Sequence, residues 1–130
     1  MSEKRVIRTE AAPAPFQGAP YSQAISAGGL VFVSGQLGLE PGETTLEGKD
    51  IEQQTRQVLD NLKAILETAG SGLDRLLKTT VFLADLADFT VMNNIYSEYV
   101  GDAPPARATV SVAALPSGAL VEIDAVALAE

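Results

Sequence analysis

The segment from Asp50 to Gly70 constrains the fold more than any other part of the chain, because its apolar residues recur with helical spacing. The apolar stripe consists of Ile51, Val58, Leu59, Leu62, Ile65, Leu66 and Ala69. Asp50 and Gln53 occupy the two positions of a capping box, and Gly70 suits the left-handed residue that ends a helix. An amphipathic helix buries its apolar face against another element, so this segment predicts a folded, layered protein.

Short segments with β propensity surround this helix. The predicted strands comprise residues 23–27, 30–34, 78–84, 107–113 and 120–128, with an additional short strand beginning at Val6 and Ile7. Gly28 and Gly29 tolerate positive φ and predict a two-residue hairpin turn, and Gly35 is expected to end that hairpin. Apolar residues between Phe89 and Val100 predict a second amphipathic helix.

The order of these elements, ββαβαββ, predicts one α+β domain over residues 1–130, with both helices on one face of a mixed sheet. One face of the last strand carries Val121, Ile123, Ala125 and Ala127. The other face carries Glu122, Asp124, Val126 and Leu128. Because the helices cover one face only, Val126 and Leu128 would have little to cover them in a monomer. The pattern therefore predicts oligomerisation through the sheet face.

The chain contains neither cysteine nor histidine, which excludes several kinds of chemistry. Disulfides, thiolate nucleophiles, Cys-ligated zinc and Ser-His pairs are ruled out, and we expect no metal site. A formal net charge of -8 argues against binding of nucleic acid. The N-terminal residues do not resemble a signal peptide and no run of ~20 apolar residues occurs, so we expect a cytoplasmic protein with no membrane partner.

Arg107 is the first candidate site residue, because an acidic protein that binds a small anion needs a dedicated cation. It follows Pro104-Pro105-Ala106, whose restricted backbone presents the guanidinium at the entrance of a strand, on the same face as Thr109. Its planar fork suits a carboxylate. The alternative is an ordinary solvated or ion-paired arginine, which is the commoner fate of arginines in strands.

Glu122 is the second candidate, although the alternative is a solvated strand residue paired with a lysine or an arginine, and Asp124 on the same face has an equal claim from the pattern alone. If the last two strands form a simple hairpin centred near Ser117, Glu122 lies ~17 Å from Arg107, at roughly 3.3 Å per residue. Either the strands do not form a simple hairpin, or the two residues meet across a subunit interface. We favour the interface, because the uncovered sheet face already predicts one.

Four further residues are candidates for lining a ligand site, each with a structural alternative. Gly35 could allow a ligand to approach the backbone, and Ser34 could supply a hydroxyl, although glycine after a strand is more often a turn. Tyr21 could cover a ligand or pack. Asn93 lies among apolar residues, where a structural hydrogen bond is the commoner role.

Several short motifs, taken together, resemble the RidA/YjgF family of reactive-intermediate deaminases over nearly the whole chain. The motifs are Pro20-Tyr21-Ser22-Gln23, Ser34-Gly35-Gln36, Thr79-Thr80-Val81-Phe82-Leu83, Pro105-Ala106-Arg107, Leu115-Pro116 and Val121-Glu122-Ile123-Asp124-Ala125. The resemblance implies a chorismate-mutase-like α+β fold and a homotrimer with clefts between subunits. It also implies hydrolysis of reactive enamine and imine intermediates, such as 2-iminobutanoate and 2-iminopropanoate derived from 2-aminoacrylate, to 2-keto acids and ammonia, with no cofactor.

The same resemblance implies a role for each candidate residue. Arg107 would hold the substrate carboxylate, and Glu122 would position the attacking water. The substrate-binding residues would be Tyr21, Ser34, Gly35, Asn93, Arg107 and Thr109. Ala19 stands between Gly18 and Pro20, where the family usually joins glycine to proline directly, and Thr109 replaces a common cysteine; both departures bear on substrate choice.

Three other functions remain open at this point. A ligand-binding or regulatory protein could hold a keto acid in the same pocket without turnover. A ribonuclease or translation inhibitor has been suggested for some relatives, but the charge of -8 and the absence of histidine weigh against it. A deaminase specialised for one catabolic pathway is the third alternative.

Overall fold

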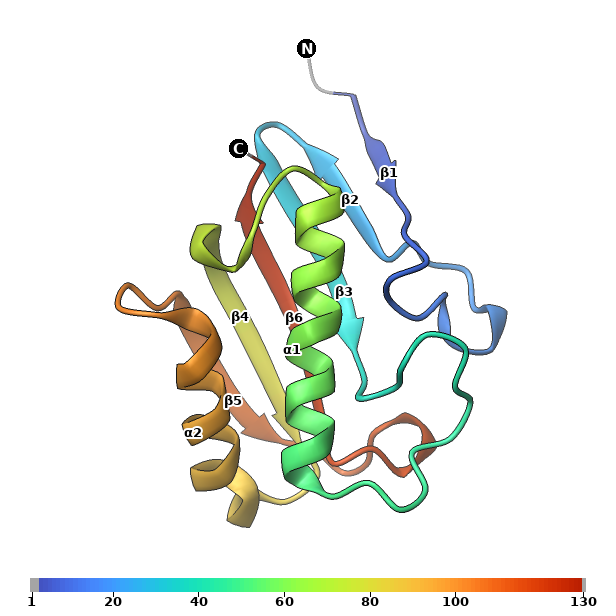
Figure 1. Cartoon of the computed structure of the whole chain (residues 1–130), viewed down its shortest axis with the longest axis vertical. Helices are drawn as coiled ribbons and strands as arrows, with labels where there is room; N and C mark the ends of the chain where they lie inside the picture. The colour runs from blue at the N-terminus through green and yellow to red at the C-terminus, as the bar shows by residue number, and fades with distance from the viewer. Residues whose placement is uncertain (1–2, 130) are drawn as a thin grey trace.

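Two helices cover one face of a six-stranded mixed sheet in the computed structural model, which describes residues 3–129 (Figure 1). The strands are β1 (Arg5–Ile7), β2 (Ala24–Ala27), β3 (Leu30–Gln36), β4 (Leu76–Leu83), β5 (Ala106–Ser111) and β6 (Val121–Leu128). The helices are α1 (Ile51–Thr68) and α2 (Phe89–Val100). The strand order is β1-β2-β3-β6-β4-β5, and only β4 and β5 run parallel. The predicted α+β class and the additional N-terminal strand are confirmed.

Helix α1 begins and ends where the sequence predicts. The side chain of Asp50 accepts a hydrogen bond from the Gln53 amide (2.9 Å), and the Gln53 side chain accepts one from the Asp50 amide (3.0 Å). At the other end Gly70 has a φ of +82°, and the Ser71 amide donates to the Leu66 carbonyl (2.8 Å), which is the Schellman pattern. The apolar stripe of α1 is buried against the sheet, and each buried Leu or Ile contributes about 1.5 to 3 kcal/mol.

The alternation along β6 is also confirmed. Its four residues from Val121 to Ala127 that face the helices are buried, whereas Leu128 on the opposite face is 43% exposed. On that opposite face Phe32 of β3, 44% exposed, lies beside Val126 of β6. An apolar area of the sheet therefore remains uncovered in a single chain.

One open alternative about the sheet is decided, and one expectation is wrong. Strands β5 and β6 do not form a simple hairpin, because β4 lies between them. Every residue of β5 is half-buried or exposed, which suits an edge strand, whereas β6 buries an entire face and takes the centre. Gly35 does not end its strand either: β3 continues to Gln36 through an irregularity between Val33 and Gln36.

The hairpin turn between β2 and β3 is confirmed, since Gly28 and Gly29 have φ values of +59° and +80°. Among residues 3–129, no helix is long and apolar enough to cross a membrane.

Candidate functional site

A cavity of about 520 Å³ opens where β3 and β6 meet the loops at one end of the sheet. Its polar lining is provided by Gln17, Tyr21, Ser34, Gln36 and Glu122. Its apolar lining includes Phe16, Leu37, Leu39 and Pro116. Three chain segments thus enclose it: the N-terminal loop, the segment after β3 and the turn before β6. Both the volume and the mixed lining are typical of a small-molecule site.

Glu122 is the ionisable residue of this cavity. It is half-buried, and it forms no hydrogen bond or ion pair with any of residues 3–129. Burial raises its pKa above the ordinary value, and the negative charge of Asp124 on the same face raises it further. A carboxylate with a raised pKa and no protein partner is available to exchange a proton with a ligand or a water.

The position of Glu122 depends on Gly35 of the neighbouring strand. A Cβ atom built on Gly35 would collide with the Glu122 carboxyl group, at 2.8 Å from its Cδ atom. The φ angle of Gly35 is not in the left-handed region, so this glycine is required for space and not for backbone conformation. The sequence suggested that a ligand approaches the backbone at Gly35. In the structure the Glu122 side chain of the protein itself makes this close approach.

The hydroxyls of Tyr21 and Ser34 have complementary hydrogen-bonding states. The phenol oxygen of Tyr21 accepts from the Phe16 amide (2.6 Å), which leaves its proton available for donation. The hydroxyl of Ser34 donates to the Ser22 carbonyl (2.6 Å), which leaves it as an acceptor. The Tyr21 and Ser34 hydroxyls therefore offer a ligand a donor and an acceptor beside the Glu122 carboxylate.

Gln23, immediately after Ser22, fixes the N-terminal wall of the cavity. Its side chain is 3% exposed and its Nε2 atom donates to the carbonyls of Thr9 (3.0 Å), Ala12 (3.2 Å) and Pro13 (2.8 Å). Its Oε1 atom accepts from the Thr9 amide (2.7 Å). The buried side-chain amide of Gln23 thus satisfies backbone groups of this loop that no helix or strand pairs.

Arg107 lies in a different environment, against α2. Its Nη2 atom donates to Oδ1 of Asn93 (2.6 Å), which confirms a structural hydrogen bond for that asparagine. The guanidinium carbon lies 4.8 Å from the ring centroid of Tyr96 and 5.7 Å from that of Phe89. The Tyr96 hydroxyl is hydrogen-bonded to Thr79 (2.6 Å), so the ring nearer to Arg107 is itself held by the sheet.

Arg107 and Glu122 lie on opposite faces of the sheet. Arg107 is in register with Thr79, whose side chain contacts α2, whereas Glu122 is in register with Phe82, three residues further along β4. Since faces alternate along a strand, an odd offset places the two side chains on different sides. Thr109 shares the face of Arg107. One chain therefore brings Tyr21, Ser34, Gly35 and Glu122 together, and keeps Arg107, Asn93 and Thr109 apart from them.

The sequence patterns did not indicate the loop residues that enclose the cavity. Leu37 and Leu39 lie outside every predicted strand and helix, yet both are buried and pack with Phe16 and Leu115. The available signal was their alternation with Gly38, which is typical of a segment with one apolar side. Within residues 3–129, no group of three or more His, Cys, Asp or Glu residues is placed to hold a metal ion.

A mixed sheet with helices on one face and a carboxylate cavity on the other defines a protein of the RidA-like fold class. Residues 9–129 match the family model described as Endoribonuclease L-PSP. The chain belongs to this family, which is also called the RidA/YjgF or RutC family.

Individual relatives match over nearly their whole length. A RutC family protein of Pyrococcus horikoshii is 50% identical, covering 98% of this chain and 99% of its own. The mouse protein named 2-iminobutanoate/2-iminopropanoate deaminase is 43% identical, covering 96% of this chain and 91% of its own. The crystal structure of RidA from an Antarctic Psychrobacter species is 42% identical with a TM-score of 0.90, covering 95% of this chain and 98% of that one.

Proposed function

We propose that this chain hydrolyses 2-imino acids such as 2-iminobutanoate and 2-iminopropanoate to 2-keto acids and ammonia. The observation that carries this proposal is the half-buried Glu122 carboxylate, which faces a cavity without a protein partner and has a raised pKa. The mouse relative bears the name of this activity at 43% identity, which supports the same substrate class.

Imine hydrolysis suits the groups that this cavity offers. Glu122 accepts a proton from water as the water oxygen bonds to the imine carbon and the C=N bond becomes a single bond, and it returns this proton to the nitrogen, which gives the neutral carbinolamine. Glu122 then takes the hydroxyl proton and delivers it to the nitrogen as the C–N bond breaks, so the carbonyl forms and ammonia leaves. A raised pKa places Glu122 nearer to neutrality, where one group can both accept and return a proton. The chemistry needs no metal and no cofactor.

Arg107 would complete the site from a neighbouring subunit of a homotrimer. Its guanidinium suits the substrate carboxylate, but its own chain holds it on the helix-covered face, opposite to Glu122. The uncovered apolar side chains of Phe32 and Leu128 support association through the other face of the sheet. In this arrangement Tyr21, Ser34, Gly35 and Glu122 come from one subunit, and Arg107, Asn93 and Thr109 from the next.

The name of the family model raises cleavage of RNA as a second activity. A net charge of -8 disfavours a polyanionic substrate, and the chain has no histidine to serve as the usual acid–base group near neutral pH. A keto-acid binding protein without turnover remains the stronger rival, because the cavity would serve it equally well.

The decisive experiment generates 2-iminopropanoate in situ and follows its loss with the wild-type chain and with Glu122→Gln. We expect the substitution to lower kcat by roughly 10² or more, the usual contribution of a general acid–base group. Glu98→Gln is the matched control, because Glu98 is an exposed carboxylate paired with Arg56 on the helix side. A wild-type chain that binds 2-keto acids but does not accelerate the loss of any 2-imino acid would establish the binding protein instead.

A further inference from the structure

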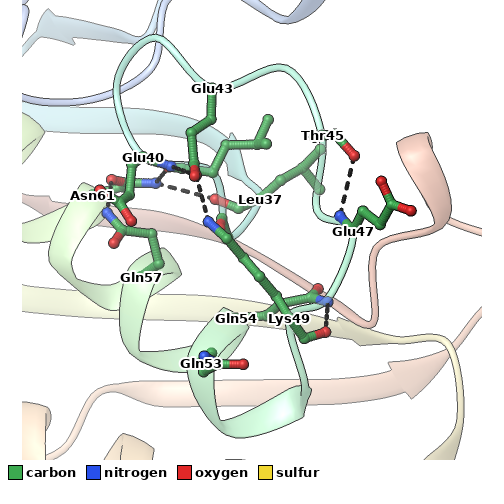
Figure 2. Close-up of polar contacts among 12 residues, drawn as sticks. Leu37, Glu40, Glu43, Thr45, Glu47, Lys49, Gln53, Gln54, Gln57 and Asn61 are labelled. Carbon is green, nitrogen blue, oxygen red and sulfur yellow. Dashed lines mark hydrogen bonds and ion pairs between the residues drawn. The ribbon is translucent and has the colours of Figure 1, made fainter.

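The segment that follows β3 is tied to α1 through its backbone carbonyl groups. Asn61, in the middle of α1, is fully buried, and its Nδ2 atom donates to the carbonyls of Leu37 (3.0 Å) and Leu39 (2.9 Å) (Figure 2). The Oδ1 atom of Asn61 accepts from Nε2 of Gln57 (2.9 Å). Both donor hydrogens of this amide are thus used, and both go to the same short stretch of chain.

Further contacts hold Gly38, the residue between these two leucines. The Nζ atom of Lys49 donates to the Gly38 carbonyl (3.4 Å), and Lys49 is itself ion-paired with Glu43 (Figure 2). A Cβ atom built on Gly38 would lie 2.7 Å from the Cα atom of Gln54, so this backbone is pressed directly against α1. Three successive carbonyls therefore accept hydrogen bonds from side chains, and the segment behaves as part of the helix layer.

Anchoring the carbonyls on the helix places the two leucine side chains at the cavity. Leu37 and Leu39 are 9% and 4% exposed, they line the cavity that contains Glu122, and they pack with Phe16 from the N-terminal loop. The carbonyls of Leu37 and Leu39 are the acceptors of the Asn61 amide, so displacing either leucine loosens these hydrogen bonds. The apolar wall of the cavity is therefore set from α1.

We propose that Asn61 is a positioning residue that determines which 2-imino acid side chains the cavity accepts. The inference rests on the proposed deaminase function, and it assigns the apolar wall at Leu37 and Leu39 to the substrate's side chain. Apolar pockets discriminate by shape, and one misplaced methylene changes relative rates by roughly 10-fold or more. Loosening this wall is thus expected to alter selectivity between large and small substrates, with less effect on the chemistry at Glu122.

The test compares two substitutions that disturb the wall by different routes. Asn61→Asp removes both donors with little change in volume, and Gly38→Ala forces the segment away from Gln54. Thr55→Val is the matched control: Thr55 is equally buried in α1, and its hydroxyl donates only within the helix, to the Ile51 carbonyl. Thermal unfolding of each variant identifies any that has simply lost its fold, in which case the other variant carries the test.

The measurement is kcat/KM for the imines of alanine and of leucine, together with calorimetric binding of pyruvate and 4-methyl-2-oxopentanoate, which requires no turnover. We expect the leucine-to-alanine ratio of kcat/KM to change by roughly 10-fold in Asn61→Asp and Gly38→Ala, and the ratio of keto-acid affinities to follow it. Thr55→Val should leave both ratios unchanged.

A double-mutant cycle separates positioning from general destabilisation. Leu39→Ala should change the same ratio, and combining it with Asn61→Asp should add little, because both substitutions act through one wall. A wild-type chain that is active while neither variant changes the ratio overturns this inference and leaves the deaminase function intact. A wild-type chain that neither hydrolyses any imine nor binds any keto acid removes the proposed function and this inference together.

Discussion

The two regions that carry candidate site residues are incomplete in opposite ways. Around Glu122 the chain builds a cavity with a free carboxylate, a donor at Tyr21 and an acceptor at Ser34, but no basic side chain lines it among residues 3–129. Around Arg107 the chain builds a rigid cation, stacked on Tyr96 and hydrogen-bonded to Asn93, at the edge of the sheet. One region is a pocket whose described lining has no basic side chain, and the other is a cation on the opposite face of the sheet.

Under the proposed function, a small substrate with a carboxylate would need both regions at once. The anion requires the guanidinium, and the reacting carbon requires Glu122, yet the two side chains leave the sheet on opposite faces. Rotating one side chain cannot bring them together, because the sheet lies between them. We propose that a second copy of the chain, with its Arg107 edge against the cavity of the first, satisfies both requirements and covers apolar surface.

The largest expected effect comes from removing the cation of the Arg107 region by substitution. Arg107→Ala should lower kcat/KM by a factor that corresponds to the loss of roughly 3 to 5 kcal/mol of transition-state stabilisation. The reason is that a desolvated substrate carboxylate is left without a partner. Arg56→Ala is the control, because Arg56 is an exposed arginine paired with Glu52 and Glu98. Its loss should cost less than ~1 kcal/mol of the same transition-state stabilisation. A cost that small at Arg107 would mean that Arg107 does not bind the substrate.

Mixing two inactive variants then tests whether the site is shared. When Arg107→Ala and Glu122→Gln chains are refolded together, an interface that takes one region from each chain retains both residues in about a quarter of the sites. Recovery of roughly that fraction of wild-type activity is expected, measured as imine loss at constant total protein. A site contained within one chain would give no recovery, and a light-scattering mass of a monomer would contradict the shared site independently.

A smaller effect is expected from disturbing only the cavity side. Gly35→Ala inserts a methyl group into the space of the Glu122 carboxyl, which must turn aside, so we expect a lower kcat and, because this carboxyl ends a flexible side chain, a loss of only about 1 kcal/mol in unfolding free energy. In a Glu122→Ala background the clash disappears, and the same substitution should be nearly neutral in urea unfolding. Equal destabilisation in both backgrounds would show that Gly35 serves the backbone and not the carboxylate.

The sequence predicted the helices and strands of this molecule better than it predicted which strands lie side by side in the sheet. Helix α1 and the two faces of β6 follow from local periodicity, because the apolar pattern and the capping residues are carried by the segment itself. The insertion of β4 between β5 and β6 depends on how many strand faces the core can cover, which no local pattern expresses. The ~17 Å separation inferred from a hairpin therefore rested on a wrong neighbour, although the conclusion that one chain keeps Arg107 from Glu122 agrees with the structure.

The site was predicted unevenly for a similar reason. Tyr21, Ser34 and Glu122 became a set only through the family resemblance, since they come from three distant segments and no spacing links them. Asn61 carried a local signal that was not used: it lies within the buried stripe of α1, where an amide must find partners. Polar residues on an apolar helical face deserve the same scrutiny as charged residues in strands.

The smallest expected effect concerns the electrostatics of the open face. Asp124→Asn keeps the acceptor that Asp124 offers to the Thr80 amide (3.2 Å) but removes the like charge that raises the Glu122 pKa. The ionised base is the active form, so activity should fall as pH drops through the pKa of Glu122, and this limb should move to lower pH in the variant. Burial is the larger cause of the raised pKa, so the limb should stay above the range of an ordinary glutamate.

The same shift predicts a sign for stability. Between the unfolded and the folded pKa of Glu122 the folded chain binds more protons, so the unfolding free energy should decrease as pH rises through this window. Asp124→Asn should lower the upper limit of this pH window, which is the folded-state pKa of Glu122. Asp60→Asn, on the helix side beside Tyr99, should leave the window unchanged. If Asp124→Asn changes neither the pH dependence of activity nor that of the unfolding free energy, the two carboxylates do not interact. Burial alone then sets the proton affinity of Glu122. The cavity would then depend on its walls and not on its charges, which would make the contrast with the cation-centred Arg107 region sharper.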